Sequence, residues 1–222
     1  MNSRKHEYNP PPHTGLDIIY LDDSLLVVNK PSGLLSVPGR GEDKKDSLVT
    51  RVQHEYPEAL PVHRLDMATS GLMLMAKNKE MQGLLGKMFE QRQISKCYMA
   101  IIDGRLEQDS GEINLPLITD WPNRPLQKVD HNIGKSALTR YKVLQYDSTN
   151  NTSRIELIPE TGRTHQLRVH MQAIGHAIVG DRLYAAAEVQ KKSDRLLLHA
   201  ERLTFIHPVN EQEIELISEA PF

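Results

Sequence analysis

Short apolar runs separated by turn-forming residues alternate along the chain with a few amphipathic segments. Continuous apolar runs at 25–28 and 72–76 are typical of buried strands. The polar turn at 22–24 favours a hairpin in which residues 17–20 pair with residues 25–28. After Asn78, apolar residues recur at helical spacing, which predicts an amphipathic helix that packs on the core. Its apolar stripe consists of Met81, Leu84, Leu85, Met88 and Phe89.

The rest of the pattern predicts two more helices, several strands and one long irregular stretch. A helix capped by Asp46 or Ser47 is expected before Tyr56, and another is expected to begin at Thr164 and stop at Gly175. Further strands are expected at 98–102, 138–145, 154–158, 196–199 and 203–206. The stretch 115–135 contains three prolines, and a loop of this length in a compact domain is usually functional or mobile.

Together these elements predict an α+β fold with a mixed, mostly antiparallel β-sheet core and flanking helices and loops. Residues 1–15, with three consecutive prolines, are expected to form a flexible N-terminal arm. Residues 16–222 are long enough to form a single domain of this class, and 39% of the chain is hydrophobic.

Composition excludes several classes of protein. The single cysteine, Cys97, excludes an internal disulfide and a cysteine-cluster metal site. No apolar run approaches the ~18 residues of a membrane span, and the first fifteen residues lack the apolar core of a secretory signal. We therefore expect a cytoplasmic protein that does not bind membranes.

Charge alone gives little indication of a partner, because the formal net charge is −2. Bases do gather locally: between residues 120 and 142 five bases accompany two acids. Such a stripe on a nearly neutral protein can bind a small RNA element. Ordinary solvated surface is the alternative interpretation.

The densest polar cluster in an apolar setting is residues 63–71, directly before the buried strand at 72–76. Asp66 and the Thr-Ser-Gly that follows it are turn-forming residues. A turn at the mouth of a strand displays side chains on a rigid frame, which suits a reactive carboxylate. The plainer alternative is that Asp66 caps the turn and that Arg64 pairs with it.

A second cluster, residues 161–170, places Arg163, His165 and Arg168 near the start of a predicted helix. Two arginines beside a helix N-terminus can form an anion site, either for a phosphate or for the carboxylate of Asp66. His165 and His170 are five residues apart, about 140° around a helix, so they are not the i, i+4 pair of a zinc helix.

A third cluster is Lys96-Cys97-Tyr98, where a tyrosine opens a predicted strand and could simply pack at a sheet edge. With these clusters and the segment Asn29-Lys30-Pro31-Ser32-Gly33, the chain from Val27 onward resembles the RluA family of pseudouridine synthases. The segments that resemble the family's motifs, in the family's order, are 29–33, 63–71, 96–98 and 162–170.

The resemblance implies that the protein converts uridine in RNA to pseudouridine without a cofactor or metal. The N–C glycosidic bond breaks, the uracil turns, and a C–C bond forms. Asp66 would be the catalytic carboxylate, with Arg168 nearby to favour its ionised form. Tyr98 would be either a base or a stacking platform for uracil, and attack of Asp66 on ribose or on the base stays open.

The target uracil must leave its stack, and Arg64 could fill the vacated space or hold a phosphate. The resemblance further implies two RNA partners, a tRNA anticodon stem-loop and a 23S rRNA hairpin, a monomeric enzyme, and no S4-type RNA-binding domain before Asp17. The side chains expected to bind RNA or to assist base flipping are Arg64, Arg40, Arg124, Lys128, Arg163 and His165.

Two other functions are compatible with parts of the sequence. A non-catalytic RNA-binding module would use the basic stretch but would not need a carboxylate between arginine clusters. A metal-dependent hydrolase could use His63, Asp66, His165 and His170 as ligands.

Overall fold

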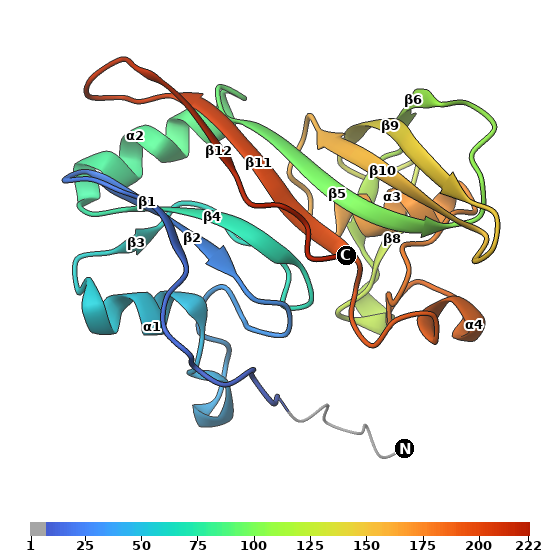
Figure 1. The fold of residues 1–222 in the computed structure, drawn as a ribbon, viewed down its shortest axis with the longest axis horizontal. Coiled ribbons are helices and arrows are strands. Elements are labelled where there is room, and N and C mark those ends of the chain that lie inside the picture. The colour runs from blue at the N-terminus through green and yellow to red at the C-terminus, as the bar shows by residue number, and fades with distance from the viewer. Residues whose placement is uncertain (1–7) are drawn as a thin grey trace. The chain divides into compact units, whose positions relative to one another are not determined.

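The computed structural model describes residues 8–222 and divides into two compact units, the first ending at Gly86 and the second beginning at Lys87 (Figure 1). Residues 1–7, which belong to the predicted N-terminal arm, lie outside the described residues. Each unit contains an antiparallel sheet with short helices and loops. The predicted α+β class with a mostly antiparallel core is confirmed.

The sheet of unit 1 has the strand order β1-β2-β4, with the short β3 also paired to β4. The register of β2 on β4 places Lys30, at the end of β2, opposite Gly71, near the start of β4. Alternate side chains of the two strands form one core cluster with α1. The elements are β1 (Ile18–Leu21), β2 (Leu25–Lys30), η1 (Glu42–Lys44), α1 (Leu48–Glu55), β3 (Leu60–Pro61) and β4 (Ser70–Ala76).

Helix α1 begins after Ser47, one of the two caps that the sequence allowed. Ser47 Oγ accepts a hydrogen bond from Thr50 N at 3.2 Å, and Thr50 Oγ1 accepts one from Ser47 N at 2.8 Å. This reciprocal capping box satisfies two backbone donors at the helix start. Asp46 instead forms a bidentate ion pair with Arg51 at 2.8 and 2.7 Å, and Arg51 holds the pKa of Asp46 below its usual range.

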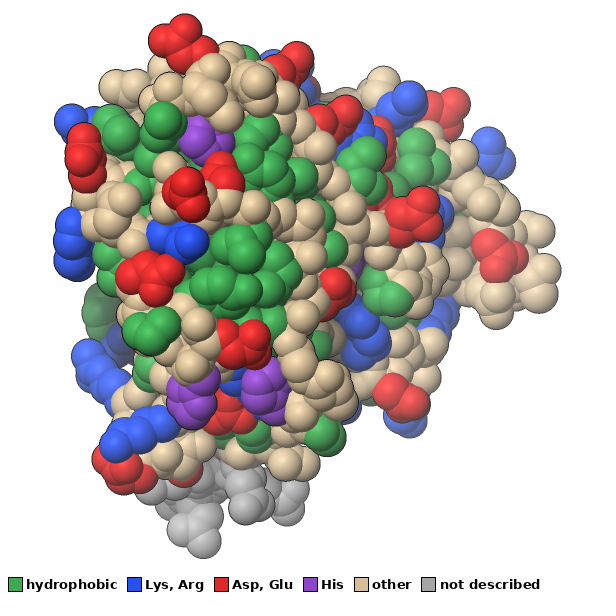
Figure 2. All heavy atoms as spheres, turned by 60° about the vertical axis from the view of Figure 1, so that its left-hand side comes forward, with side chains coloured by type: hydrophobic (Ala, Val, Ile, Leu, Met, Phe, Trp, Pro, Cys, Tyr) green, Lys and Arg blue, Asp and Glu red, His purple; other side chains and the backbone are tan. Residues whose placement is uncertain are grey.

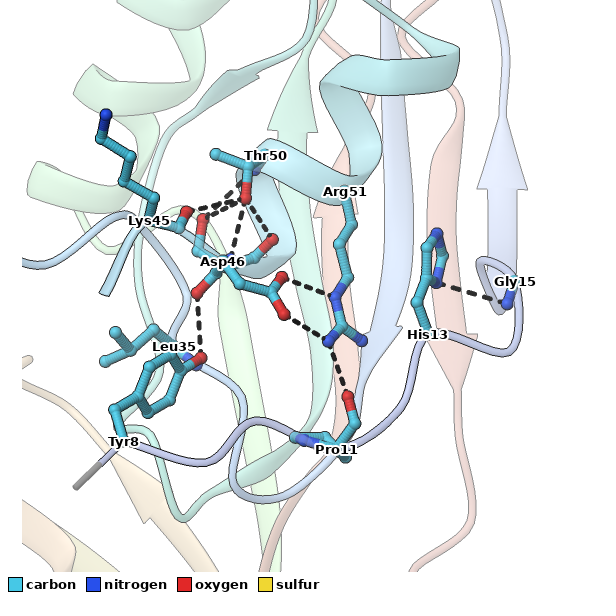
Figure 3. Close-up of polar contacts among 10 residues, drawn as sticks. Tyr8, Pro11, His13, Gly15, Leu35, Lys45, Asp46, Thr50 and Arg51 are labelled. Carbon is cyan, nitrogen blue, oxygen red and sulfur yellow. Dashed lines mark hydrogen bonds and ion pairs between the residues drawn. The ribbon is translucent and has the colours of Figure 1, made fainter. Parts of the chain in front are cut away.

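The second half of the predicted arm is anchored to this corner of unit 1 (Figure 3). Arg51 Nη2 donates to the carbonyl oxygen of Pro11 at 2.6 Å. Tyr8 Oη donates to the carbonyl oxygen of Asp46 at 2.9 Å and accepts from Leu35 N at 3.0 Å. The polar groups of Tyr8 and Pro11 therefore have partners on α1 and in the loop before it, and the flexibility of the arm stays a prediction.

The sheet of unit 2 has the strand order β12-β11-β5-β10-β9-β6, with every pair antiparallel. Strand β5 lies inside the sheet, between β11 and β10. Helix α2 (Lys79–Glu90) leads from one unit to the other. The strands are β5 (Ser95–Asp103), β6 (Ser110–Asn114), β9 (Leu138–Asp147), β10 (Thr152–Pro159), β11 (Leu198–Ile206) and β12 (Glu213–Ile217).

The two strands expected at 196–199 and 203–206 are in fact the single strand β11. Its register on β5 shifts between Ala200 and Arg202. An irregularity of this kind inserts an extra residue without ending the strand. The polar pair at 201–202 therefore interrupts the apolar pattern but not the pairing.

The stretch 115–135 is more regular than expected, because β7 (Leu117–Thr119) and β8 (Gln127–Val129) pair as a hairpin. The 3-10 helix η2 (Trp121–Asn123) forms its turn. The three prolines of the stretch all lie outside the two strands, where a missing N–H breaks no ladder.

The helices of unit 2 are short, and α3 (Gln166–Ala173) lies against β8, β9 and β10. It begins two residues later than predicted, because His165 adopts a left-handed conformation with φ of 55°. Gly175, with φ of 87°, follows its end as expected. A further turn of helix, α4, covers Ala187–Gln190. None of the helices within residues 8–222 is long and apolar enough to span a bilayer.

One buried histidine makes the stability of the fold depend on pH. His199 is 1% exposed, its Nε2 lies 2.9 Å from the carbonyl oxygen of Ser218, and burial lowers its pKa to about 4. In the unfolded chain the same group titrates near ~6.5. The unfolded state therefore binds the proton first, and this contribution to stability is complete above pH ~6.5 and declines toward pH ~4.

We expect acidification over this range to remove about 3 kcal/mol of unfolding free energy through His199. Urea unfolding at several pH values should show a shallower acid slope for His199→Gln than for the wild type. Replacement of the exposed His131 by Gln is the control and should leave the slope unchanged. Identical slopes for His199→Gln and the wild type would contradict the assignment.

Candidate active site

Asp66 lies in the turn that precedes β4, and the residues after it are fixed by the end of β2. Lys30 is fully buried, and its ammonium group donates to the carbonyl oxygens of Pro31, Leu34 and Met67 at 2.9, 2.7 and 3.1 Å. A buried ammonium ion is tolerated only when such acceptors replace its water shell. One of the three carbonyls belongs to the residue directly after Asp66, so Lys30 ties the Asp66 turn to β2.

Four further hydrogen bonds fix the same turn on both sides of Asp66, two of them after it in the chain and two before it. Gly33 N donates to the Met67 carbonyl at 2.9 Å, and Ser32 Oγ donates to the carbonyl of Ala68 at 2.7 Å.

On the other side, Ser36 Oγ both donates to the carbonyl oxygen of Leu65 at 2.7 Å and accepts from its N–H at 3.0 Å. The backbone of Asp66 is thus held through both neighbours, while its side chain is half-buried. The sequence pattern marked the segment 29–33 as a motif but did not indicate that Lys30 and Ser36 bind this turn.

The other polar residues of this cluster differ in role. His63 Nε2 accepts a hydrogen bond from Leu74 N at 2.9 Å, so this ring nitrogen braces β4. Arg64 is exposed, as is Arg40 in the loop before α1. Both arginines are therefore available at the surface of unit 1 for contacts with a ligand.

Arg168, in the first turn of α3, forms a buried ion pair in unit 2. Its Nε and Nη2 donate to the two carboxylate oxygens of Asp181 at 2.8 and 2.7 Å, and the side chains are 5% and 0% exposed. Asp181 Oδ1 also accepts from the N–H groups of Leu183 and Tyr184 at 2.9 and 3.2 Å. Sequence reasoning did not assign this partner. The pairing of Arg168 with Asp66, which belongs to the other unit, stays a prediction.

Tyr184 connects this ion pair to the start of α3 and to the β7–β8 hairpin. The Arg168 guanidinium carbon lies 5.2 Å from the centre of the Tyr184 ring. The Tyr184 hydroxyl lies 2.6 Å from His165 Nδ1 and accepts from Gln127 N at 2.9 Å. The structure therefore brings His165 and Arg168 together around one tyrosine. This residue too was missed, because its role arises from contacts far apart in sequence.

Arg163 does not bind the same partner as Arg168. Its Nε donates to the carbonyl oxygen of Ser136 at 3.1 Å, and the side chain is exposed. Arg163 and Arg168 therefore bind different partners within unit 2, unlike the shared anion site expected from their spacing.

Tyr98 lies on β5, where its partners across the sheet are Leu157 on β10 and Ala200 on β11. The alternative that it packs at a sheet edge is therefore wrong, because β5 is an interior strand. Its side chain is half-buried. An interior strand gives a functional ring a fixed position.

The residues expected in the basic stretch lie on the β7–β8 hairpin. Lys128 is exposed on β8, and Arg124 follows η2 with its guanidinium carbon 4.4 Å from the centre of the Trp121 ring. On the face drawn in Figure 2, which brings the left-hand side of Figure 1 forward, basic and acidic side chains are interspersed and hydrophobic side chains form patches between them. Binding of a polyanion on that face would therefore depend on individual bases.

The histidines of the metal-hydrolase alternative have structural partners. Both nitrogens of His170 are engaged, with Thr139 Oγ1 at 2.9 Å and the carbonyl oxygen of Leu115 at 3.0 Å, and burial lowers its pKa. One nitrogen of His63 and one of His165 are also occupied, as described above. Across the part of the chain that the structure describes, His, Cys, Asp and Glu side chains form no group of three suited to hold a metal ion.

Comparison with known proteins gives a consistent result. The family model described as RNA pseudouridylate synthase matches residues 24–173. The chain is 52% identical over 215 residues to the dual-specificity RNA pseudouridine synthase RluA of Escherichia coli strain K12, covering 97% of this chain and 98% of that protein. It is 55% identical over 206 residues to RluA of Vibrio parahaemolyticus, covering 91% and 82%.

Two solved human structures have a similar fold. Human RNA Pseudouridylate Synthase Domain Containing 1 superposes with a TM-score of 0.79 at 29% identity, covering 96% of this chain and 87% of that one. Human RNA Pseudouridylate Synthase Domain Containing 4 gives a TM-score of 0.70 at 26% identity, covering 92% and 88%. The likeness therefore extends over nearly the whole chain in both sequence and structure.

The buried ion pair gives a prediction about stability. Asp181→Asn removes a buried carboxylate from the buried Arg168 guanidinium, which should cost about 3 kcal/mol or more of unfolding free energy. The matched control is Asp103→Asn, which removes the charge from a partly exposed pair with Lys192 and should cost less than about 1 kcal/mol. Urea unfolding measures the free energy of unfolding of both variants. Equal losses of unfolding free energy would contradict a larger contribution of the buried Arg168–Asp181 pair.

Proposed function

Because the chain belongs to the RNA pseudouridylate synthase family, we propose that it isomerises specific uridines in RNA stem-loops to pseudouridine, with Asp66 as the catalytic carboxylate. The protein is thus an isomerase, and its family favours an enzyme over a non-catalytic RNA-binding module. The observation that carries the assignment of Asp66 is its placement on a turn whose backbone is fixed on both sides.

The reaction balances without a cofactor. The bond between N1 of uracil and C1′ of ribose breaks, a bond between C5 and C1′ forms, C5 loses its proton, and N1 gains one. Cleavage develops positive charge on the sugar, which one carboxylate can stabilise or attack. A second acid is not required to release a leaving group, since the uracil stays bound throughout. The proposal includes two alternative mechanisms, in which Asp66 attacks either the ribose or the base.

Two residues of unit 2 complete the proposed catalytic set. Arg168 keeps its charge at any working pH and would favour the ionised form of Asp66. Its ion pair with Asp181 supports this role, because two hydrogen bonds, from Nε and from Nη2, fix the orientation of the guanidinium group. Tyr98, on an interior strand, would either take part in removing the C5 proton or stack on the uracil. The proposal thereby assigns the reaction to residues 16–222 as one catalytic domain.

The proposed substrates are a tRNA anticodon stem-loop and a 23S rRNA hairpin. The support for two kinds of RNA is the similarity of almost the whole chain to proteins named dual-specificity RNA pseudouridine synthase. We assign base flipping to Arg64, whose exposed guanidinium could occupy the space of the extruded uracil. Arg40, Arg124, Lys128, Arg163 and His165 are the proposed RNA contacts. We further propose a monomer that works in the cytoplasm, where both RNAs are found.

The proposal predicts that Asp66→Asn lowers turnover by roughly a thousandfold or more, because the replacement keeps the shape but removes the charge and the nucleophile. Release of tritium from RNA labelled at C5 of uracil measures turnover directly. RNA affinity should change by less than about twofold, since Asp66 is not among the proposed phosphate contacts. Replacement of the exposed Asp23 by Asn is the matched control and should retain full turnover. Substantial tritium release by Asp66→Asn would overturn the assignment.

A further inference from the structure

Trp121 is the only tryptophan of the chain, and it is 65% exposed on the turn of the β7–β8 hairpin. An exposed tryptophan offers a large flat apolar face and an N–H donor to another molecule, and tryptophan is enriched at interfaces. Neither the proposed reaction nor the proposed phosphate contacts use this ring. The proposed function therefore gives this exposed ring no role.

The turn that carries Trp121 is held by its own hydrogen bonds. Asp120 N donates to the carbonyl oxygen of Leu126 at 2.9 Å, and Leu126 N donates to that of Asn123 at 3.1 Å. Asn123 Nδ2 donates to Asp120 Oδ2 at 2.8 Å. These bonds close the turn on itself, so the exposed ring is presented from a fixed backbone.

Arg124 lies over the same ring, with its guanidinium carbon 4.4 Å from the ring centre. A cation this close is attracted by the negative face of an indole. It pre-orders the ring and places N–H donors beside it, while most of the tryptophan side chain remains exposed. An unpaired nucleotide fits this arrangement, because its base offers a face to stack and its phosphate accepts from a guanidinium.

The hairpin is also connected to the neighbourhood of Arg168. Gln127 N, at the start of β8, donates to the Tyr184 hydroxyl at 2.9 Å, and the Arg168 guanidinium lies 5.2 Å from the Tyr184 ring centre. Within unit 2 the Trp121 turn therefore has a defined position relative to Arg168. A nucleotide bound at Trp121 would be held at a fixed spacing from the nucleotide on which the enzyme acts.

We infer that Trp121, with Arg124 stacked against it, is a subsite for an unpaired nucleobase of the substrate RNA, separate from the uridine that is isomerised. The inference rests on the proposed function for the identity of the RNA. The surrounding charge favours RNA over a protein partner, since residues 120–142 carry five bases and two acids. The subsite selects loops in which a second base is free to stack, and a fully paired duplex cannot fill it.

The single tryptophan makes the subsite directly observable. Titration of the wild-type protein with a synthetic RNA stem-loop that has an unpaired, uridine-containing loop should quench tryptophan fluorescence. The same sequence closed into a full duplex should bind without comparable quenching. Unquenched fluorescence under conditions where the stem-loop is bound, as judged by electrophoretic mobility, would overturn the inference and would leave the ring for a protein contact.

Substitutions test the energetic role of the ring. Trp121→Ala should weaken stem-loop binding about tenfold and raise KM with little change in kcat, whereas Trp121→Phe, which can still stack, should stay within about threefold of wild type. The dependence of binding on salt should be unchanged in Trp121→Ala, because no phosphate contact is lost. Lys128→Ala is the contrasting variant and should lower the salt dependence by about one ion.

A double-substitution cycle identifies the stacked base. Abasic nucleotides placed singly through the loop should reveal one position, other than the modified uridine, whose loss weakens the wild type as much as Trp121→Ala does. With RNA that is abasic at that position, Trp121→Ala should bind as tightly as the wild-type protein does. Additive losses at every loop position would contradict a stacking subsite.

The tritium-release assay on the wild-type protein separates this inference from the proposed function. Turnover without fluorescence quenching rejects the Trp121 subsite and leaves the synthase assignment in place. Quenching by the stem-loop without turnover on any RNA supports the subsite and rejects the proposed reaction.

Discussion

A cation that leaves water must find acceptors in the protein, and this constraint shapes both segments on which the proposed reaction depends, the turn with Asp66 and the first turn of α3 with Arg168. The ammonium group of Lys30 is met by three carbonyl oxygens, which bind the end of β2 to the turn that carries Asp66. The guanidinium of Arg168 is met by the carboxylate of Asp181, which also collects two backbone N–H groups. Lys30 thereby fixes the backbone beside Asp66, and Asp181 fixes the side chain of Arg168, so both interactions position a residue of the proposed catalytic set.

The hairpin and α3 show how a polar network extends this order to the surface of unit 2. Tyr184 receives the Arg168 guanidinium on its ring, holds His165 through its hydroxyl, and accepts from the backbone of β8. An exposed binding element placed on such a support loses little freedom when it binds a ligand. The network therefore relates a solvent-facing tryptophan to a buried ion pair, and it gives rigid support to the hairpin that we propose to contact RNA.

Local patterns in the sequence predicted the elements that local forces determine. The apolar runs of β2 and β4 and the cap of α1 depend on neighbouring residues and were predictable. The predicted apolar stripe of α2 is confirmed only in part, because Met81 and Leu85 are buried but Leu84 is 38% exposed. Strand β11 was wrongly divided, because a shift in its register on β5 accommodates the polar pair at 201–202. The β7–β8 hairpin was missed because its prolines suggested irregular chain.

Hydrogen bonds and ion pairs between residues far apart in the chain could not be predicted from the sequence pattern. Asp181 lies thirteen residues from Arg168, and Lys30 reaches Met67 thirty-seven residues away. The candidate residues could be chosen from motif and resemblance, but the groups that hold them arise only from the folded chain.

The central claim is that the Asp66 carboxylate isomerises defined uridines in cellular RNA. Pseudouridine mapping by carbodiimide modification and sequencing tests it most directly, in a strain whose own copy is deleted and replaced by either the wild-type or the Asp66→Asn gene. Our account predicts that particular loop uridines lose their modification on deletion and regain it with the wild type alone. Restoration of those pseudouridines by Asp66→Asn, or a map that the deletion leaves unaltered, would contradict it.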